Sequence, residues 1–92
     1  MSNTTQTTKG SSTETTISLH TELVGIIKTL PSLTNDLSLE LIKFFGSNDI
    51  TVIENYDAYY DLENLGVYQI AALNSRLRWI LCFAKIARRQ LA

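Results

Sequence analysis

A long apolar seam near the C-terminal end constrains the fold of this 92-residue chain more than any other feature. Between residues 63 and 91 there is no Pro, the residue that interrupts a helix most strongly. Apolar residues recur there in alternating steps of three and four: Ile70, Leu73, Leu77, Ile80, Ala84, Ala87 and Leu91. The spacing predicts a helix over residues 65–91, about 40 Å long at about 1.5 Å per residue.

The apolar surface of this predicted helix is wider than one seam requires. At about 100° per residue, Arg78, Lys85 and Arg89 fall on one narrow stripe, and apolar side chains fill an arc of roughly 220°. Burying one large apolar side chain contributes about 1.5–3 kcal/mol, so leaving three exposed forgoes roughly 5–9 kcal/mol, comparable to the stability of a small domain. Because three short helices are too small to cover this surface, we expect it to contact a second copy of the chain or another protein.

The residues expected to bind this partner lie on the long helix and in an acidic, Tyr-rich segment before it. On the helix they are Leu77, Trp79, Ile80, Phe83, Ile86 and Leu91. Upstream they are Tyr56, Tyr59 and Tyr60, because Tyr combines a large contact area with a hydroxyl group. The alternative for the tyrosines is that one or two of them complete the core.

The charges are segregated along the chain, although the net charge is only −1. Residues 36–63 contain seven acids and one Lys, whereas residues 76–89 contain five basic residues and no acid. We expect the two blocks to face each other, within one chain or between two. Arg76 falls inside the apolar arc, so we expect it to pair with Asp61, Glu63 or an acid of the partner; it belongs to the same predicted binding surface.

The N-terminal residues have a different composition from the rest. Residues 1–16 are rich in Thr, Ser and Asn, and their one large apolar residue is the initiating Met. Such a segment buries too little surface to offset its ordering entropy, which predicts a disordered tail. Residues 17–92 are then expected to form a single helical interaction domain.

Two shorter helices are predicted after this tail. The first extends from about Ser18 to Leu30, where apolar residues recur at helical spacing and a Pro follows. The second is the stretch "LSLELIKFF", with Asn35 or Asp36 as its N-cap and Gly46 as the residue that ends it.

A third short helix is predicted over residues 49–60, begun by Asn48 or Asp49. The β-branched "ITVI" in this stretch could instead start a strand. A helix is preferred because no second strand is available to pair with it. The predicted fold class is therefore all-α: a small bundle of three short helices and one long C-terminal helix, preceded by a disordered tail.

The chain offers little for catalysis or for a cofactor. Its one His, His20, and its one Cys, Cys82, have no companions at metal-ligand or nucleophile–base spacing, so we expect a structural His and a packed, inert thiol. We predict no catalytic residue, no metal and no cofactor. The single Cys fits a reducing cytoplasm, and no apolar run approaches the roughly 20 residues that cross a bilayer, so no membrane association is expected.

Two classes of function fit these patterns. The first is a small non-enzymatic, cytoplasmic protein–protein interaction module, such as a regulator, inhibitor or assembly adaptor, that acts through the long helix as a homodimer or on a larger protein. The alternative is a DNA-binding transcriptional regulator that uses Gln69–Arg78 as its recognition helix. In that case the nucleic-acid contacts are the cations Arg78, Lys85, Arg88 and Arg89.

Overall fold

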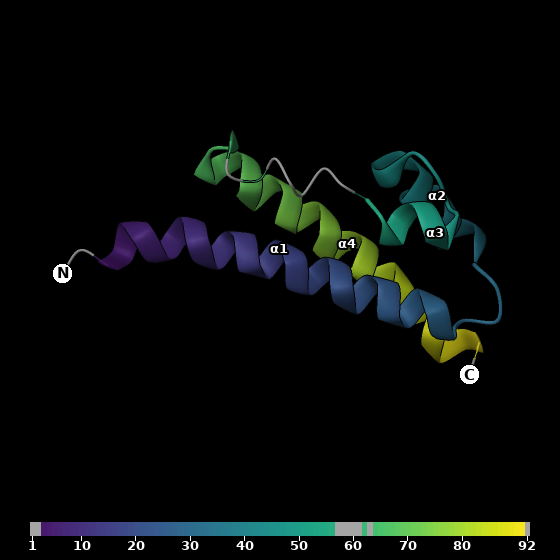
Figure 1. Cartoon of the computed structure of the whole chain (residues 1–92). Coiled ribbons are helices and arrows are strands. Elements are labelled where there is room, and N and C mark those ends of the chain that lie inside the picture. Colours follow the sequence, from purple (N-terminus) through teal and green to yellow (C-terminus); the bar gives the residue numbers. More distant parts are fainter. Residues whose placement is uncertain (1–2, 57–61, 63, 92) are drawn as a thin grey trace.

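The structure, a computed structural model, describes residues 3–56, 62 and 64–91, with the side chains of the first helix described from Thr13 onward. It contains helices α1 (Asn3–Thr29), α2 (Asn35–Phe45), α3 (Ile50–Glu54) and α4 (Val67–Leu91), shown in Figure 1. Within these described residues there is no strand. The predicted all-α fold with a long C-terminal helix is confirmed.

Helices α1 and α4 lie side by side and run in the same direction (Figure 1). Their contacts advance together along both helices, since Thr16 meets Asn74 and Glu22 meets Lys85. Parallel neighbours need a long connection, which α2 and α3 provide while packing against α4 and α1, respectively. With 27 residues α1 is much longer than predicted, and it lies along α4. The expectation that short helices leave α4 largely uncovered is therefore wrong for the side of α4 that faces α1.

The core lies where α2 and α3 cover the α1–α4 pair. Fully enclosed side chains come from all four helices and from the connection before α4: Thr16, Leu23, Leu37, Leu41, Ile53, Leu62, Ile70, Leu77 and Ile80. The apolar seam of α4 points into this core, with Ala84 and Ala87 also buried. Leu91, in the last turn of α4, is the seam residue that remains exposed.

Local side-chain chemistry sets the ends of α2. Thr34 is its N-cap, and the Thr34 hydroxyl accepts a hydrogen bond from the Leu37 N–H at 3.3 Å. The predicted cap, Asn35 or Asp36, lies one or two residues too late. Gly46 ends the helix with φ +79°, a left-handed conformation that glycine adopts without a Cβ clash, as predicted.

The helical alternative for the stretch after residue 49 is confirmed over Ile50–Glu54 and the strand is wrong there. Asp49 is the N-cap, because its carboxylate accepts a hydrogen bond from the Thr51 N–H at 2.9 Å. The helix ends at Glu54 with Asn55 as its C-cap, so the predicted continuation is wrong for residues 55 and 56, and residues 57–60 lie outside the described residues.

Helix α1 includes residues that the sequence assigned to the N-terminal tail. Thr16 is completely buried, and its hydroxyl donates a hydrogen bond to Asn74 Oδ1 on α4. Thr16 is therefore part of the folded structure, and helix α1 includes residues from Asn3 onward. Composition misses this contact because Thr16 is buried as a hydrogen-bonded polar residue rather than as an apolar one.

Candidate functional site

Helix α4 has two apolar faces, and only one of them is used by the fold. Opposite the buried seam lies a second set of residues, again in steps of three and four, all of them exposed: Tyr68, Ala72, Ser75, Trp79, Cys82 and Ile86. We call this set the outer row. Trp79 remains 57% exposed and Ile86 45% exposed, although the opposite side of the same helix is fully enclosed.

Trp79 and Ile86 form the apolar centre of the outer row. They are seven residues apart, which places them about 10 Å from each other along the helix axis. The ring of Trp79 packs edge-on against that of Phe83, with 5.3 Å between the ring centroids. Because Phe83 is itself half-buried against the core, it supports the indole on one side and leaves the other side open.

Cations border the outer row. Arg78 and Arg89 are exposed along one edge, and on the other edge the Arg76 guanidinium lies 5.2 Å from the centroid of the Phe44 ring. Lys85 forms an ion pair with Glu22 of α1 at 3.4 Å. Helix α4 contains no Asp or Glu. The outer row is therefore an apolar stripe in a positively charged setting.

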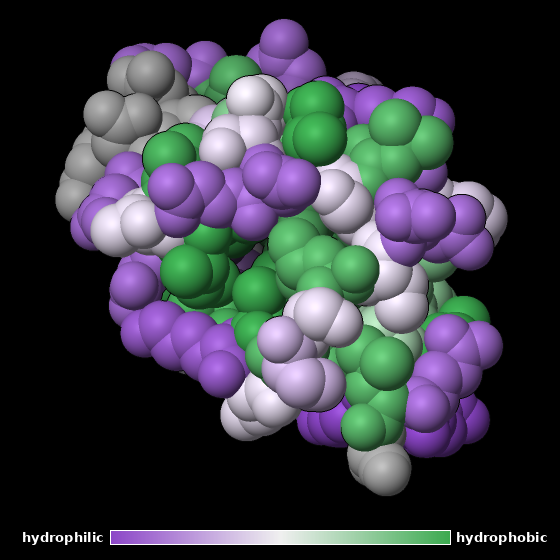
Figure 2. Space-filling model, turned by 90° about the vertical axis from the view of Figure 1, so that its right-hand side faces the viewer, coloured by the Kyte–Doolittle hydropathy of each residue, from purple (hydrophilic) through white to green (hydrophobic). Residues whose placement is uncertain are grey.

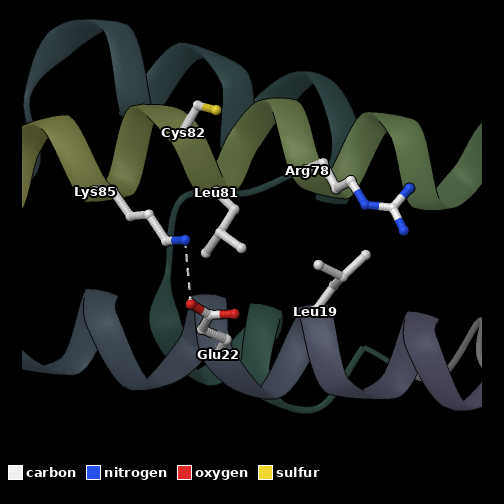
Figure 3. A pocket seen from close by; sticks show the side chains of 6 residues that line it. All are labelled: Leu19, Glu22, Arg78, Leu81, Cys82 and Lys85. Atoms are coloured by element: carbon white, nitrogen blue, oxygen red, sulfur yellow. Dashed lines mark ion pairs between the residues drawn. The ribbon is translucent and has the colours of Figure 1, made fainter.

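A hollow of about 320 Å³ opens between α1 and α4 beside the outer row. Figure 3 shows Leu19 and Leu81 pointing toward each other there, with the Lys85–Glu22 ion pair next to them. Arg78 and Cys82 complete the lining, and Cys82 also belongs to the outer row. Cys82 is a free, exposed cysteine, so its predicted packed position is wrong.

The structure divides the predicted binding residues of α4 into two groups. Leu77 and Ile80 are buried in the chain's own core and do not lie on the surface. Trp79 and Ile86 are exposed, Leu91 is exposed in the last turn, and Phe83 is half-buried. Sequence periodicity alone did not separate these groups because all of them fall within the same wide apolar arc.

The aromatic and acidic residues upstream are only partly described. Tyr56 packs edge-on against Phe45, with 5.0 Å between the ring centroids, so it completes the core as the alternative interpretation expected. Tyr59 and Tyr60 lie outside the described residues. The acids predicted to pair with Arg76, Asp61 and Glu63, lie outside them as well.

Among the described residues, no ion pair joins the two charge blocks. Lys85 pairs with Glu22, which precedes the acidic block, and Glu54 of that block pairs with Lys28 at 2.5 Å. The remaining exposed cations of α4 form no ion pair with a described acid: Arg76, Arg78, Arg88 and Arg89. They are therefore available to a binding partner.

His20 has a structural role. Its Nε2 donates a hydrogen bond to the carbonyl oxygen of Ile53 at 2.7 Å, and its ring lies 5.9 Å from that of Phe45. These contacts connect α1 to α3 and α2. Across the part of the chain that the structure describes, no group of three or more His, Cys, Asp or Glu side chains is placed to hold a metal ion.

Sequence reasoning missed a second exposed apolar pair, Leu39 and Ile42 on α2. They occupy the outward side of the helix whose other side buries Leu37 and Leu41. Figure 2 shows apolar surface gathered on the end of the molecule where α2 and α3 meet the C-terminal turns of α1 and α4. The sequence does contain a signal for this pair, because Leu39 and Ile42 are three residues apart and lie away from the row of α2 that is buried.

Among the described residues, none of the helices has a stretch long and apolar enough to cross a bilayer. No protein-family model, no curated protein and no solved structure matches this chain.

Proposed function

We propose that this chain is a small non-enzymatic protein–protein interaction module that binds its partner through the outer row of α4. The observation that supports it is the exposure of Trp79 and Ile86 in one row on a helix whose opposite face is buried. Exposed apolar residues grouped in this way mark interaction surfaces, and Trp is among the residues that contribute most to binding. A cytoplasmic regulator, inhibitor or assembly adaptor fits this surface and the free thiol of Cys82.

The exposed area indicates how much of the surface a partner must use. Full burial of a large apolar side chain contributes about 1.5–3 kcal/mol, so burying the exposed halves of Trp79 and Ile86 contributes about 1.5–3 kcal/mol together. Micromolar binding requires about 8 kcal/mol. A partner must therefore also use the hollow beside Cys82, the half-buried Phe83 and the cations at the edges. The partner is a second copy of the chain, as the sequence predicts, or a different protein.

The alternative function, DNA binding through Gln69–Arg78, receives support from the cations along α4 that have no described acid as partner. Two contacts weigh against it. Asn74 is buried and accepts a hydrogen bond from Thr16, and the Gln69 Oε1 accepts one from the Gly66 N–H at 2.8 Å. In this arrangement Asn74 does not reach a base edge, and the oxygen that Gln69 would need for a bidentate contact to adenine is occupied.

The experiment that tests the proposed function uses two matched double variants. Trp79→Ser with Ile86→Ser removes the apolar centre of the outer row, and Leu39→Ser with Ile42→Ser makes the same change on α2, where the side chains are equally exposed. Proteins that co-purify with the wild-type chain are identified by mass spectrometry and then titrated as purified proteins. We expect the α4 variant to lose the partner and the α2 variant to keep it.

Retention by the α4 variant together with loss by the α2 variant would move the binding surface to α2 and contradict the proposal. An electrophoretic shift assay on duplex DNA at about 50 mM salt tests the alternative, because phosphate contacts are strongest at low salt. Tight DNA binding that survives the Trp79→Ser and Ile86→Ser changes would favour the DNA-binding function.

A further inference from the structure

We propose that the outer row of α4 takes an amphipathic helix whose apolar side is bordered by Asp and Glu. This inference rests on the proposed function and specifies the partner's chemistry. It follows from the spacing of the exposed residues, from the charges at their edges and from the faces of α4 that the chain covers itself.

The spacing of the outer row matches a helix. Its members advance in steps of three and four from Tyr68 to Ile86, a length of about 27 Å at about 1.5 Å per residue. An amphipathic helix presents its own apolar side chains at the same spacing, so successive turns of the two helices meet. Trp79, Cys82 and Ile86 supply contacts on consecutive turns, and the hollow lined by Leu19 and Leu81 lies beside the middle one.

The charges at the edges of the outer row favour a partner that carries acidic residues. Arg78 and Arg89 lie on one edge, Arg76 lies on the other, and α4 itself contains no carboxylate. Glu22 of α1 faces this region but is paired with Lys85. Carboxylates on both sides of a bound helix would therefore meet cations that have no described acid to pair with, which favours docking and raises the association rate.

A second copy of α4 has no acidic residue that could pair with these cations. Two outer rows packed against each other would bring Arg78 and Arg89 of both copies to one interface, and neither helix would contribute an acid. Like charges placed together in this way disfavour association. The charges of α4 thus argue for a different partner segment over the predicted pairing of two α4 helices.

The buried face of α4 argues against a lipid surface. A helix that lies in a membrane interface inserts a broad apolar face. Here Leu77, Ile80 and Ala84 are enclosed in the chain's own core, and only the narrow outer row remains. Duplex DNA also leaves the exposed Ile86 unexplained, because phosphate contacts bury no aliphatic side chain.

The test uses two synthetic helical peptides that share one apolar heptad pattern and differ in their flanking residues, Glu in one and Lys in the other. Trp79 is the only Trp of the chain, so with peptides that lack Trp its emission reports docking directly. We expect the Glu peptide to shift the emission of Trp79 to shorter wavelengths and to bind at least tenfold more tightly than the Lys peptide. This preference should weaken as salt increases.

Charge reversal provides the second readout. Arg78→Glu with Arg89→Glu should invert the preference between the two peptides. Lys28→Glu with Lys43→Glu changes the net charge by the same amount on exposed positions of α1 and α2, and it should leave the preference unchanged. Circular dichroism confirms that each variant is folded before it is titrated.

Four results would overturn the inference. Equal affinity for both peptides would remove the preference for acids and leave the proposed function intact. If neither peptide binds, the outer row does not accept a free helix. A shift of Trp79 emission caused by anionic vesicles or duplex DNA, and not by the Glu peptide, would assign the row to that ligand. A stable dimer in sedimentation equilibrium with Trp79 buried would assign it to a second copy. If Trp79→Ser with Ile86→Ser leaves every identified partner bound, the proposed function itself fails.

Discussion

The hydrogen bond between Thr16 and Asn74 gives the sharpest test of how α1 packs on α4. Thr16 is fully buried and Asn74 is 4% exposed, so water does not readily replace either partner. Thr16→Val keeps the shape of the side chain and removes the hydroxyl donor. We expect it to lower the free energy of unfolding by about 1–3 kcal/mol, the penalty for leaving a buried polar group without its partner.

The double variant separates this hydrogen bond from the packing of the same side chains. Thr16→Val combined with Asn74→Leu removes donor and acceptor together, so neither partner of this hydrogen bond is left buried without the other. We therefore expect the double variant to be more stable than the sum of the single changes predicts. The interaction energy should fall between about 0.5 and 3 kcal/mol.

Urea unfolding followed by circular dichroism measures these free energies, with an unchanged dependence on urea as the sign that the folded state is preserved. A loss of 1 kcal/mol corresponds to a fall in Tm of about 4–8 °C for a domain of this size. Ser75→Ala changes an exposed polar neighbour and should stay within about 0.5 kcal/mol of the wild type. If Thr16→Val behaves like Ser75→Ala, residue 16 lies outside the folded core and α1 does not pack on α4 in this register.

Four further substitutions test other parts of the fold by the same unfolding assay. Gly46→Ala should lower the free energy of unfolding by about 1–2 kcal/mol because Gly46 has φ +79°. Gly25→Ala, in an exposed helical position where a Cβ meets nothing within 4 Å, should raise it by about 0.5–1 kcal/mol. If both substitutions change the stability in the same direction, the role of Gly46 as a left-handed helix cap is wrong. Ile53→Ala should lose about 2–5 kcal/mol, since Ile53 is fully enclosed; a loss below 1 kcal/mol would place α3 outside the core. Hydrogen bonds from the hydroxyl and N–H of Thr51 hold the pKa of Asp49 below its usual value, so its carboxylate contributes stability above about pH 4 that is lost as the pH falls through the folded pKa. Asp49→Asn should therefore differ from the wild type more at about pH 6 than at about pH 3, and equal differences would contradict this.

The elements of the fold follow from local sequence signals. The seam from Ile70 to Ala87 predicts α4 because its spacing is helical over many turns. Gly46 predicts the end of α2 because a left-handed residue follows many helices. Both signals lie within a few residues of the feature that they determine, which is why they succeed without knowledge of the tertiary structure.

The features that the sequence left open depend on contacts between distant residues. Thr16 is folded because it meets Asn74, 58 positions away, and nothing in the composition around Thr16 indicates this. Trp79 and Ile80 are neighbours of similar apolar character, yet one lies on the surface and the other in the core. The direction from which α1 and α2 approach α4 decides between them, so the sequence predicted a wide apolar arc without predicting which part of it stays exposed.

The central claim is that the outer row of α4 is open to a partner in the isolated chain. Acrylamide quenching of the single Trp, Trp79, measured on a sample shown to be monomeric by sedimentation velocity, tests it most directly. With 57% of the residue exposed, we predict strong quenching, which a bound partner then suppresses. A monomer in which acrylamide does not reach Trp79 would contradict the claim, because the chain would then cover its own outer row.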